Sequence, residues 1–345
     1  MKSTMAVVRL RRISLIFGIF ILSLVLLYMA GPKPDPDLNP SLPPVPASPD
    51  SLDRWIHERE RKILDLKENA NARIVWHTKD KSKTEFALVY LHGFTASPEE
   101  GAPVHRNIAE QYGMNLYLAR LAGHGRKHSD AMAGLKSEQL VSSAAEALAI
   151  GRQLGKKVIL MGTSTGATLS LYLAAHHPEI HGLILYSPLI DFFDSRSWVL
   201  TQPWGRNITE WVMGGKYVTK QDIKNPREHI IWNQTYRVEG TIALGALVKE
   251  TMTPETFQKI TQPLFMGYYY KNDTLQDSTV SVEAMQEMFE QLSTPQSRKW
   301  SVAFPHAGSH VICSSVTSDA WREVQEETAG FLEEILNLTP IEESK

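Results

Sequence analysis

Short apolar runs alternate with longer segments of helical periodicity along most of this chain. The runs are rich in Val, Ile, Leu, Tyr and Phe, as expected of strands buried on both faces of a parallel sheet. The segments between them repeat apolar residues every three or four positions, which predicts amphipathic helices. Predicted strands cover 73–77, 85–91, 115–121, 157–161, 181–187, 263–270 and 299–304. Predicted helices cover 51–69, 98–111, 137–154, 165–177, 280–292 and 319–338.

This order of elements predicts an α/β fold. Strands separated by helices pair in parallel through right-handed crossovers, because a crossover helix must pack back onto its own sheet. We therefore expect one mostly parallel sheet that is covered by helices on both faces.

The stretch 188–260 interrupts this alternation and contains no clear strand pattern. An insertion of this length is expected to have structure of its own, and we predict a helical cap over the C-terminal edge of the sheet. Its aromatic side chains either line an apolar site or form the small core of the cap. They are Phe192, Phe193, Trp198, Trp204, Trp211, Tyr217, Trp232 and Tyr236.

The N-terminal residues 1–30 form a segment of different character. An apolar run from 13 to 30 follows Lys2, Arg9, Arg11 and Arg12, and its length is close to that of a membrane-spanning helix. This pattern predicts a transmembrane anchor, with a cleaved signal peptide as the alternative. The basic flank would stay in the cytoplasm, so the remainder of the chain is expected on the exported side, periplasmic or extracellular and lumenal.

Residues 31–50 are rich in proline, which disfavours both helix and central strand. We predict a semi-rigid linker that holds the rest of the protein away from a membrane surface. The remaining residues, 51–345, are then one α/β domain that carries the cap insertion at about 188–260.

Composition narrows the function classes further. The 345 residues are 43% hydrophobic, enough for one large core, and the formal net charge of −2 argues against a nucleic-acid partner. Cys313 is the single cysteine, which excludes an intrachain disulfide and cysteine-based zinc sites. No other spacing of ligand residues indicates a metal site, and we expect no cofactor.

Candidate chemistry centres on the segment Gly162-Thr163-Ser164-Thr165-Gly166. It joins a predicted buried strand to a predicted helix, which is the context of a nucleophile elbow. A serine at such a turn is held in strained geometry with its hydroxyl exposed, and side chains at Gly162 and Gly166 would collide with neighbouring backbone. We therefore expect Ser164 to be a nucleophile.

A serine nucleophile needs a base, and histidine has the pKa for this role. Two histidines, His306 and His310, lie in the loop after the last predicted strand. His310 is the preferred base, because it follows a flexible Gly-Ser pair that lets its side chain reach over the elbow.

The base in turn needs an orienting carboxylate, expected after a strand that lies between serine and histidine in the chain. Asp273 follows the strand 263–270 by three residues and is the preferred acid. Asp277, further along, and Asp191, after the preceding strand, are the alternatives.

Two backbone amides are candidates for the oxyanion hole. The N–H of Thr165 lies at the N-terminus of the helix after the elbow, where the helix dipole favours negative charge. The N–H of Phe94, in the turn that follows 85–91, is the expected second donor.

Together these segments resemble α/β-hydrolases of the monoacylglycerol lipase and carboxylesterase type. The resemblance covers the chain from about 86 to the C-terminal helix, and it implies the α/β-hydrolase fold. It also implies Ser164 as nucleophile, Asp273 as acid, His310 as base, and Phe94 and Thr165 as oxyanion donors. The segments that carry it are His92-Gly93-Phe94-Thr95, Leu121-Ala122-Gly123-His124-Gly125, Gly162-Thr163-Ser164-Thr165-Gly166, Asn272-Asp273 and Gly308-Ser309-His310.

The leading hypothesis is a serine hydrolase that cleaves carboxylic esters through an acyl-enzyme on Ser164. Its candidate substrates are acylglycerols and lysophospholipids, because the aromatic cap suits an acyl chain. An aminopeptidase-like peptidase is the alternative on the same fold, since the same triad hydrolyses amides. A lipid-binding protein that keeps the fold without turnover is the alternative from another class.

Overall fold

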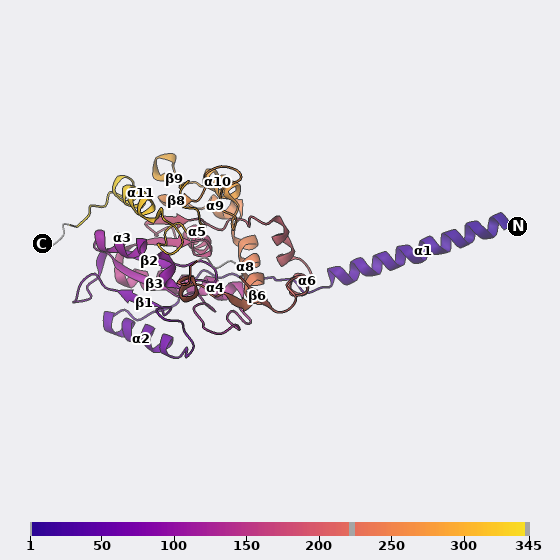
Figure 1. Ribbon diagram of the computed structural model, residues 1–345, viewed down its shortest axis with the longest axis horizontal. Helices are drawn as coiled ribbons and strands as arrows, with labels where there is room; N and C mark the ends of the chain where they lie inside the picture. Colours follow the sequence, from indigo (N-terminus) through magenta and orange to yellow (C-terminus); the bar gives the residue numbers. More distant parts are fainter. Residues whose placement is uncertain (1, 221–224, 342–345) are drawn as a thin grey trace.

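A computed structural model describes residues 2–220 and 225–341 of the chain. Within them, the central sheet has seven strands in the order β1-β3-β2-β4-β5-β8-β9 (Figure 1). β1 is antiparallel to β3, and every other neighbouring pair is parallel. The predicted mostly parallel sheet is therefore confirmed. The strands are β1 (Arg73–Val75), β2 (Thr84–Leu91), β3 (Asn115–Ala119), β4 (Gly155–Thr163), β5 (Gly182–Tyr186), β8 (Leu264–Tyr268) and β9 (Lys299–Ala303).

Helices cover both faces of this sheet, as the sequence predicts. One face packs against α2 (Pro49–Arg61), α4 (Ser137–Leu154), α5 (Thr165–His176) and α10 (Val282–Gln291). The other face packs against α3 (Val104–Gln111) and α11 (Trp321–Glu334). A short 3₁₀ turn, η3 (Gln296–Arg298), precedes β9.

Strand β4 shows why these runs are almost entirely apolar. Val158 and Leu160 point into the core on one face, and Ile159 and Met161 point into the core on the other. Successive side chains of a strand alternate between faces, so a strand covered on both sides needs apolar residues at consecutive positions.

Two predicted helices differ from the structure. The predicted helix 98–111 is divided into a 3₁₀ turn, η1 (Pro98–Gly101), and α3, because Pro103 lies between them and cannot donate a helical hydrogen bond. The predicted helix 51–69 ends at Arg61. The chain beyond it pairs with another loop, through an N–H···O bond of 2.8 Å from Lys67 to the carbonyl of Gly125.

The cap contains both helices and a pair of strands. The helices agree with the predicted helical character, but the antiparallel pair β6–β7 was not predicted, because strands of three residues show no periodicity. Trp232 is buried, whereas Trp198 and Trp211 are 62% and 82% exposed. The elements are η2 (Ser195–Thr201), α6 (Gly205–Val212), β6 (Tyr217–Thr219), α7 (Glu228–Ile231), β7 (Thr235–Arg237), α8 (Val238–Thr251) and α9 (Pro254–Phe257).

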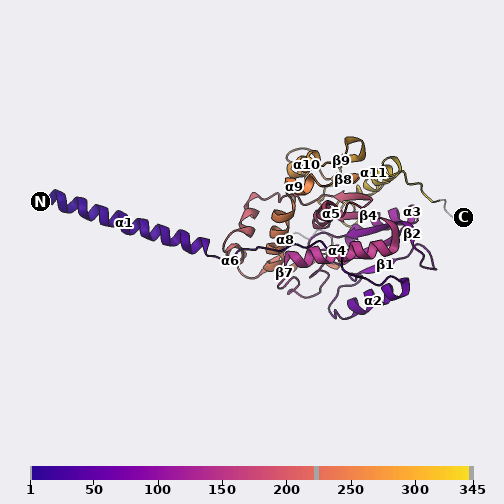
Figure 2. The ribbon, with the colours of Figure 1, turned by 180° about the vertical axis from the view of Figure 1, so that it is seen from behind.

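The N-terminal helix α1 (Lys2–Met29) projects away from the rest of the protein (Figures 1 and 2). Among the described residues, we find no helix with the length and apolar character needed to cross a membrane. The predicted transmembrane anchor, and membrane contact through it, is therefore not supported. The predicted localisation, which was argued from the same segment, stays a prediction.

The Pro-rich segment lies along the surface of the domain. Leu38, Leu42 and Val45 pack against the core on the α5 side of the sheet. The hydroxyl of Tyr172 donates to the carbonyl of Leu38 at 3.3 Å. The structure therefore differs from the predicted semi-rigid spacer, because apolar residues among the prolines pack the segment against the domain.

Candidate active site

Ser164 lies between β4 and α5 at the C-terminal edge of the sheet. Its backbone has φ 52° and ψ −116°, a region that residues with a side chain rarely adopt. The Ser164 N–H donates to the carbonyl of Tyr186 at 2.9 Å, which ties the turn to β5. A Cβ at Gly166 would collide with the carbonyl of Leu91, and one at Gly162 would lie 2.5 Å from the carbonyl carbon of Gly166. The two glycines therefore allow the close strand–helix contact of a nucleophile elbow.

His310 forms a pair with Asp277 at the same edge of the sheet. The imidazole Nδ1 lies 2.6 Å from Oδ2 of the carboxylate. The other carboxylate oxygen, Oδ1, accepts the N–H groups of Thr279 at 2.8 Å and Val280 at 3.3 Å. The Asp277 side chain is fully buried. These bonds hold the carboxylate in one orientation, so the imidazole that pairs with it is oriented as well.

The environment shifts the pKa of both partners toward the charged pair. Burial alone would lower the pKa of His310, but the charge and hydrogen bond of Asp277 outweigh burial and raise it above its usual value. Burial alone would raise the pKa of Asp277, but His310 and the two amides that the carboxylate accepts lower it below its usual value. Asp277 therefore stabilises the imidazolium that a general base becomes.

The carboxylate partner of His310 is Asp277, whereas the sequence pattern favoured Asp273. The chain after β8 folds into a tight turn that is closed by a bridge between Tyr270 and Gln276. Asp273 lies exposed in this turn, where it accepts the Tyr270 hydroxyl at 2.7 Å. The N–H of Asp277 donates to the carbonyl of Tyr269 at 3.1 Å, which returns the chain to the sheet edge. The turn therefore carries Asp273 outward and Asp277 inward.

Asp191 and His306 take no part in this pair. Asp191 is exposed, and its carboxylate accepts the N–H of the next residue, Phe192, at 2.8 Å. His306 is exposed where the loop after β9 begins. Of the two histidines in that loop, His310 is the one that pairs with the buried carboxylate.

The backbone of His310 lies one strand away from Ser164. The hydroxyl of Ser187, which follows β5, donates to the carbonyl of His310 at 2.7 Å. β5 is also the strand that binds the N–H of Ser164. Within residues 2–220 and 225–341, no hydrogen bond joins the Ser164 hydroxyl to the His310 imidazole. Such bonds are often long without substrate and shorten when substrate binds.

Two backbone amides flank Ser164. In the part of the chain that the structure describes, the N–H groups of Phe94 and Thr165 have no hydrogen-bond acceptor. A Cβ at Gly93 would lie 3.3 Å from the Cβ of Ser164, so the turn that carries Phe94 is next to the nucleophile. The predicted donors are thus available to an oxyanion.

Aromatic side chains surround this turn. The ring of Phe94 lies 5.3 Å from that of Tyr236 and 5.6 Å from that of His124, both edge-on. Tyr236 belongs to β7, so this ring contact joins the cap to the turn that carries Phe94. Rings in this arrangement form a well-defined apolar surface.

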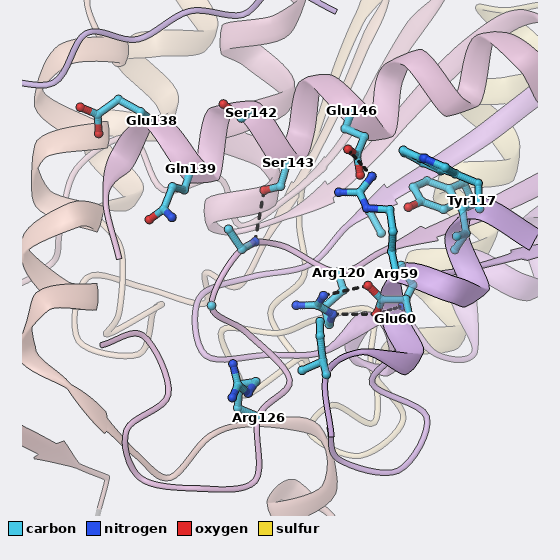
Figure 3. A pocket seen from close by; sticks show the side chains of 17 residues that line it. Arg59, Glu60, Tyr117, Arg120, Arg126, Glu138, Gln139, Ser142, Ser143 and Glu146 are labelled. Carbon is cyan, nitrogen blue, oxygen red and sulfur yellow. Dashed lines mark hydrogen bonds and ion pairs between the residues drawn. The ribbon is translucent and has the colours of Figure 1, made fainter. Parts of the chain in front are cut away.

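A separate hollow of about 500 Å³ lies between α2 and α4 (Figure 3). Arg59 pairs with Glu146, and Arg120 with Glu60, each at 2.7 Å. Ser164 does not line this hollow. The charged groups that line this hollow join α2 to the domain. We therefore interpret the hollow as part of the packing of α2 and not as a substrate site.

Comparison with known proteins identifies the family. A family model described as serine aminopeptidase, S33, matches residues 82–315, which is more than half of the chain. The chain belongs to this family. The matched region includes Ser164, Asp277 and His310, and it contains the whole cap.

One relative identified by sequence is a lipase. The thermostable monoacylglycerol lipase of Bacillus sp. (strain H-257) is 34% identical over 104 residues, which are 30% of this chain and 41% of that protein. The match thus spans less than half of the length of this relative.

Solved structures agree on the fold. One reported for the metagenome-derived lipolytic enzymes LipS and LipT has a TM-score of 0.60 at 15% identity, over 78% of this chain and 99% of that chain. Paleococcus ferrophilus monoacylglycerol lipase has a TM-score of 0.56 at 15% identity, over 76% of this chain and 97% of that chain. Est1E of Butyrivibrio proteoclasticus with bound ferulic acid has a TM-score of 0.55 at 17% identity, over 77% of this chain and 95% of that chain. The α/β-hydrolase fold and the resemblance to lipases and esterases are confirmed.

Two carboxyl groups at the site do not stand out in the sequence. The turn-forming pair Asn272-Asp273 is a sequence signal that the chain reverses before Asp277 and returns toward the strand end. Glu100 is fully buried beside the Phe94 turn, although its neighbour Glu99 is partly exposed. Their sequence context does not distinguish the two glutamates.

Proposed function

We propose that this hydrolase cleaves carboxylic esters through an acyl-enzyme on Ser164. The observation that carries the proposal is the placement of Ser164. It is a strained serine at a nucleophile elbow, it lies next to two amides that lack an acceptor among the described residues, and the His310–Asp277 pair is at the same sheet edge.

In the proposed reaction, His310 Nε2 takes the proton of the Ser164 hydroxyl while the oxygen attacks the ester carbonyl. Asp277 keeps the other proton on Nδ1 and stabilises the imidazolium. The amides of Phe94 and Thr165 donate to the oxyanion of the tetrahedral intermediate. His310 then protonates the leaving alcohol, and a water molecule activated by the same base releases the acid from the serine.

We propose acylglycerols or lysophospholipids as the substrate class. The apolar ring surface formed by Phe94 and Tyr236 supports an acyl chain next to the nucleophile. The local similarity to a monoacylglycerol lipase supports the same class. A chain-length series of nitrophenyl esters, followed by monoacylglycerols, tests the preference for the acyl group.

The first prediction concerns the nucleophile. Ser164→Ala removes the attacking oxygen, so we expect turnover of a short-chain nitrophenyl ester to fall by at least about 10⁴-fold. Labelling by a fluorophosphonate probe should disappear as well. Ser142→Ala, at an exposed position of α4, is the matched control and should keep both activities. Undiminished turnover in Ser164→Ala would refute the proposed mechanism.

A peptidase that releases N-terminal residues is the second candidate. The description of the matching family as a serine aminopeptidase favours it. Rates on aminoacyl-anilides and on acyl esters, measured with the same preparation, distinguish the peptidase from the esterase. Faster hydrolysis of the anilide would indicate a site that recognises a free amino terminus. Tight binding of a lipid ligand, with no fluorophosphonate labelling and no turnover of either substrate, would favour a non-catalytic, lipid-binding role.

A further inference from the structure

Glu100 is a buried carboxyl group that the proposed mechanism does not use. It lies in η1, the turn that follows β2 and precedes α3, and it is 1% exposed. Three donors converge on it. Oε2 accepts the N–H of Gly93 at 2.6 Å and the hydroxyl of Tyr90 at 3.1 Å, and Oε1 accepts the indole N–H of Trp232 at 3.0 Å. A buried carboxylate with both oxygens satisfied is unlike the solvated carboxylates of the surface.

The carboxyl group contacts the turn that carries a proposed oxyanion donor. Gly93 directly precedes Phe94, so its bond to Glu100 fixes the peptide next to the Phe94 amide. A Cβ at Gly93 would lie 2.9 Å from Oε1 of Glu100 and 3.3 Å from Cβ of Ser164. The carboxyl group therefore packs beside the backbone of this turn, close to the nucleophile.

The same carboxyl group reaches the cap. Trp232 follows α7, and its indole is buried against Glu100. The next residue, Asn233, donates its N–H to the carbonyl of Thr95 at 2.7 Å, at the other end of the turn. The cap is thus joined to the turn at two points, and one of them passes through Glu100.

We propose that Glu100 is a positioning residue that holds the Phe94 amide in line with Ser164 and fixes the cap on the same turn. This inference rests on the proposed function, since an oxyanion hole has a role only in a hydrolytic site. An amide aimed by a rigid support stabilises the oxyanion more than one that must reorient during the reaction.

The ionisation state of Glu100 matters for this role. Burial raises its pKa to about 7. The titratable groups that face it are Tyr90, His310 and Cys313. Ionised, the carboxylate accepts all three donors. Protonation would place a hydrogen on one of its oxygens and weaken the hold on the turn. The ionised form is therefore the active one, and activity is lost as pH falls.

His310 must also be unprotonated to act as a base, and its pKa is raised above its usual value. Two groups therefore have to lose a proton on the acid limb of kcat/KM. The slope of log kcat/KM against pH should exceed 1 over the part of this limb in which Glu100 becomes protonated. A variant with no titratable group at position 100 should show a slope of 1.

The test is Glu100→Gln with Glu99→Gln as matched control. Glutamine has one acceptor oxygen, so the N–H of Gly93 or of Trp232 would face an amide NH₂ group. We expect kcat for a nitrophenyl ester to fall about 10- to 100-fold, less than the loss of a whole oxyanion donor. KM should change by less than about threefold, because binding of the ground state does not use the oxyanion hole. Glu99 pairs with Arg73 and Arg106 in the same turn and should tolerate the change.

Trp232→Phe is the second variant, and it keeps the test decisive if Glu100→Gln does not fold. It removes the indole N–H that Glu100 accepts, so we expect a smaller fall in kcat, about threefold. The acid slope should still exceed 1, because Glu100 still titrates. The double variant should be no slower than Glu100→Gln alone, because both changes break one network.

Wild-type kcat and an acid slope still above 1 in Glu100→Gln would overturn the inference, as would a change in KM alone. Should Glu100→Gln fail to fold, wild-type kcat in Trp232→Phe would overturn it. If the wild-type protein itself shows no turnover that depends on Ser164, the proposed function fails, and the inference fails with it. Ser164-dependent turnover together with an inert Glu100→Gln substitution rejects the inference alone.

Discussion

At the scale of single residues, His310 can act as a base only while the proton stays on Nδ1 and Nε2 remains free to accept one. Asp277 meets this requirement, because its buried carboxylate accepts from Nδ1 at 2.6 Å and is itself held by the amides of Thr279 and Val280. A carboxylate held in this way fixes both the tautomer and the ring orientation.

Asp277→Asn should therefore reduce kcat by about 10³–10⁴-fold, since an asparagine amide at this position stabilises the wrong tautomer and no imidazolium. Initial rates on a nitrophenyl ester measure the effect. Asp273→Asn is the matched control in the same loop, and it should stay within about twofold of wild type because Asp273 contacts only exposed groups. The reverse ranking of the two variants would restore Asp273 as the acid.

Local chemistry explains which site residues were predictable. Ser164 and its two glycines lie in one five-residue motif. The motif sets the backbone geometry of the turn, so the position of Ser164 can be predicted from the motif alone. The acid depends on how the chain folds between β8 and α10. Asp273 and Asp277 are both close to the strand end in sequence, and the Tyr270–Gln276 bridge decides which of them faces His310.

At the scale of elements, buried strands and long helices were predicted well because their apolar pattern is repeated over many residues. α4 agrees with its predicted range, 137–154. Short elements were not predictable, since β6 and β7 have three residues each and depend on pairing with one another. The prediction for the Pro-rich segment was wrong for a related reason. Proline sets the local conformation, but the packing of Leu38 and Leu42 against the core of the domain sets the position of the segment.

The packing of this segment leads to a prediction about stability. Leu42 is partly buried against the core, so Leu42→Ala should lower the free energy of unfolding by about 1–2 kcal/mol, less than for a fully buried leucine. Leu64→Ala is the matched control, because Leu64 is 94% exposed and should change stability by less than about 0.5 kcal/mol. Urea unfolding followed by tryptophan fluorescence gives both values. Equal midpoints for the two variants would show that the segment is free in solution.

At the scale of the whole molecule, the site depends on loops that leave separate strands and meet at one sheet edge. The loop after β9 carries His310, and three residues later it buries Cys313 in the core on the α11 side. The thiol lies 3.5 Å from the hydroxyl oxygen of Thr163, the residue before the nucleophile. Burial raises the pKa of Cys313 to about 12, so the reactive thiolate is scarce in the folded protein.

Cys313 can therefore report whether this loop stays fixed to the sheet. Because it is the single cysteine, labelling by a maleimide or a disulfide reagent gives one signal, and Cys313→Ser should give none. If the loop opens only when the sheet unfolds, labelling of the native protein should be at least about 10³-fold slower than in denaturant. The rate should rise with urea in parallel with global unfolding. Native labelling within about tenfold of the denatured rate would mean that the loop opens independently, and His310 would then be oriented for only part of the time.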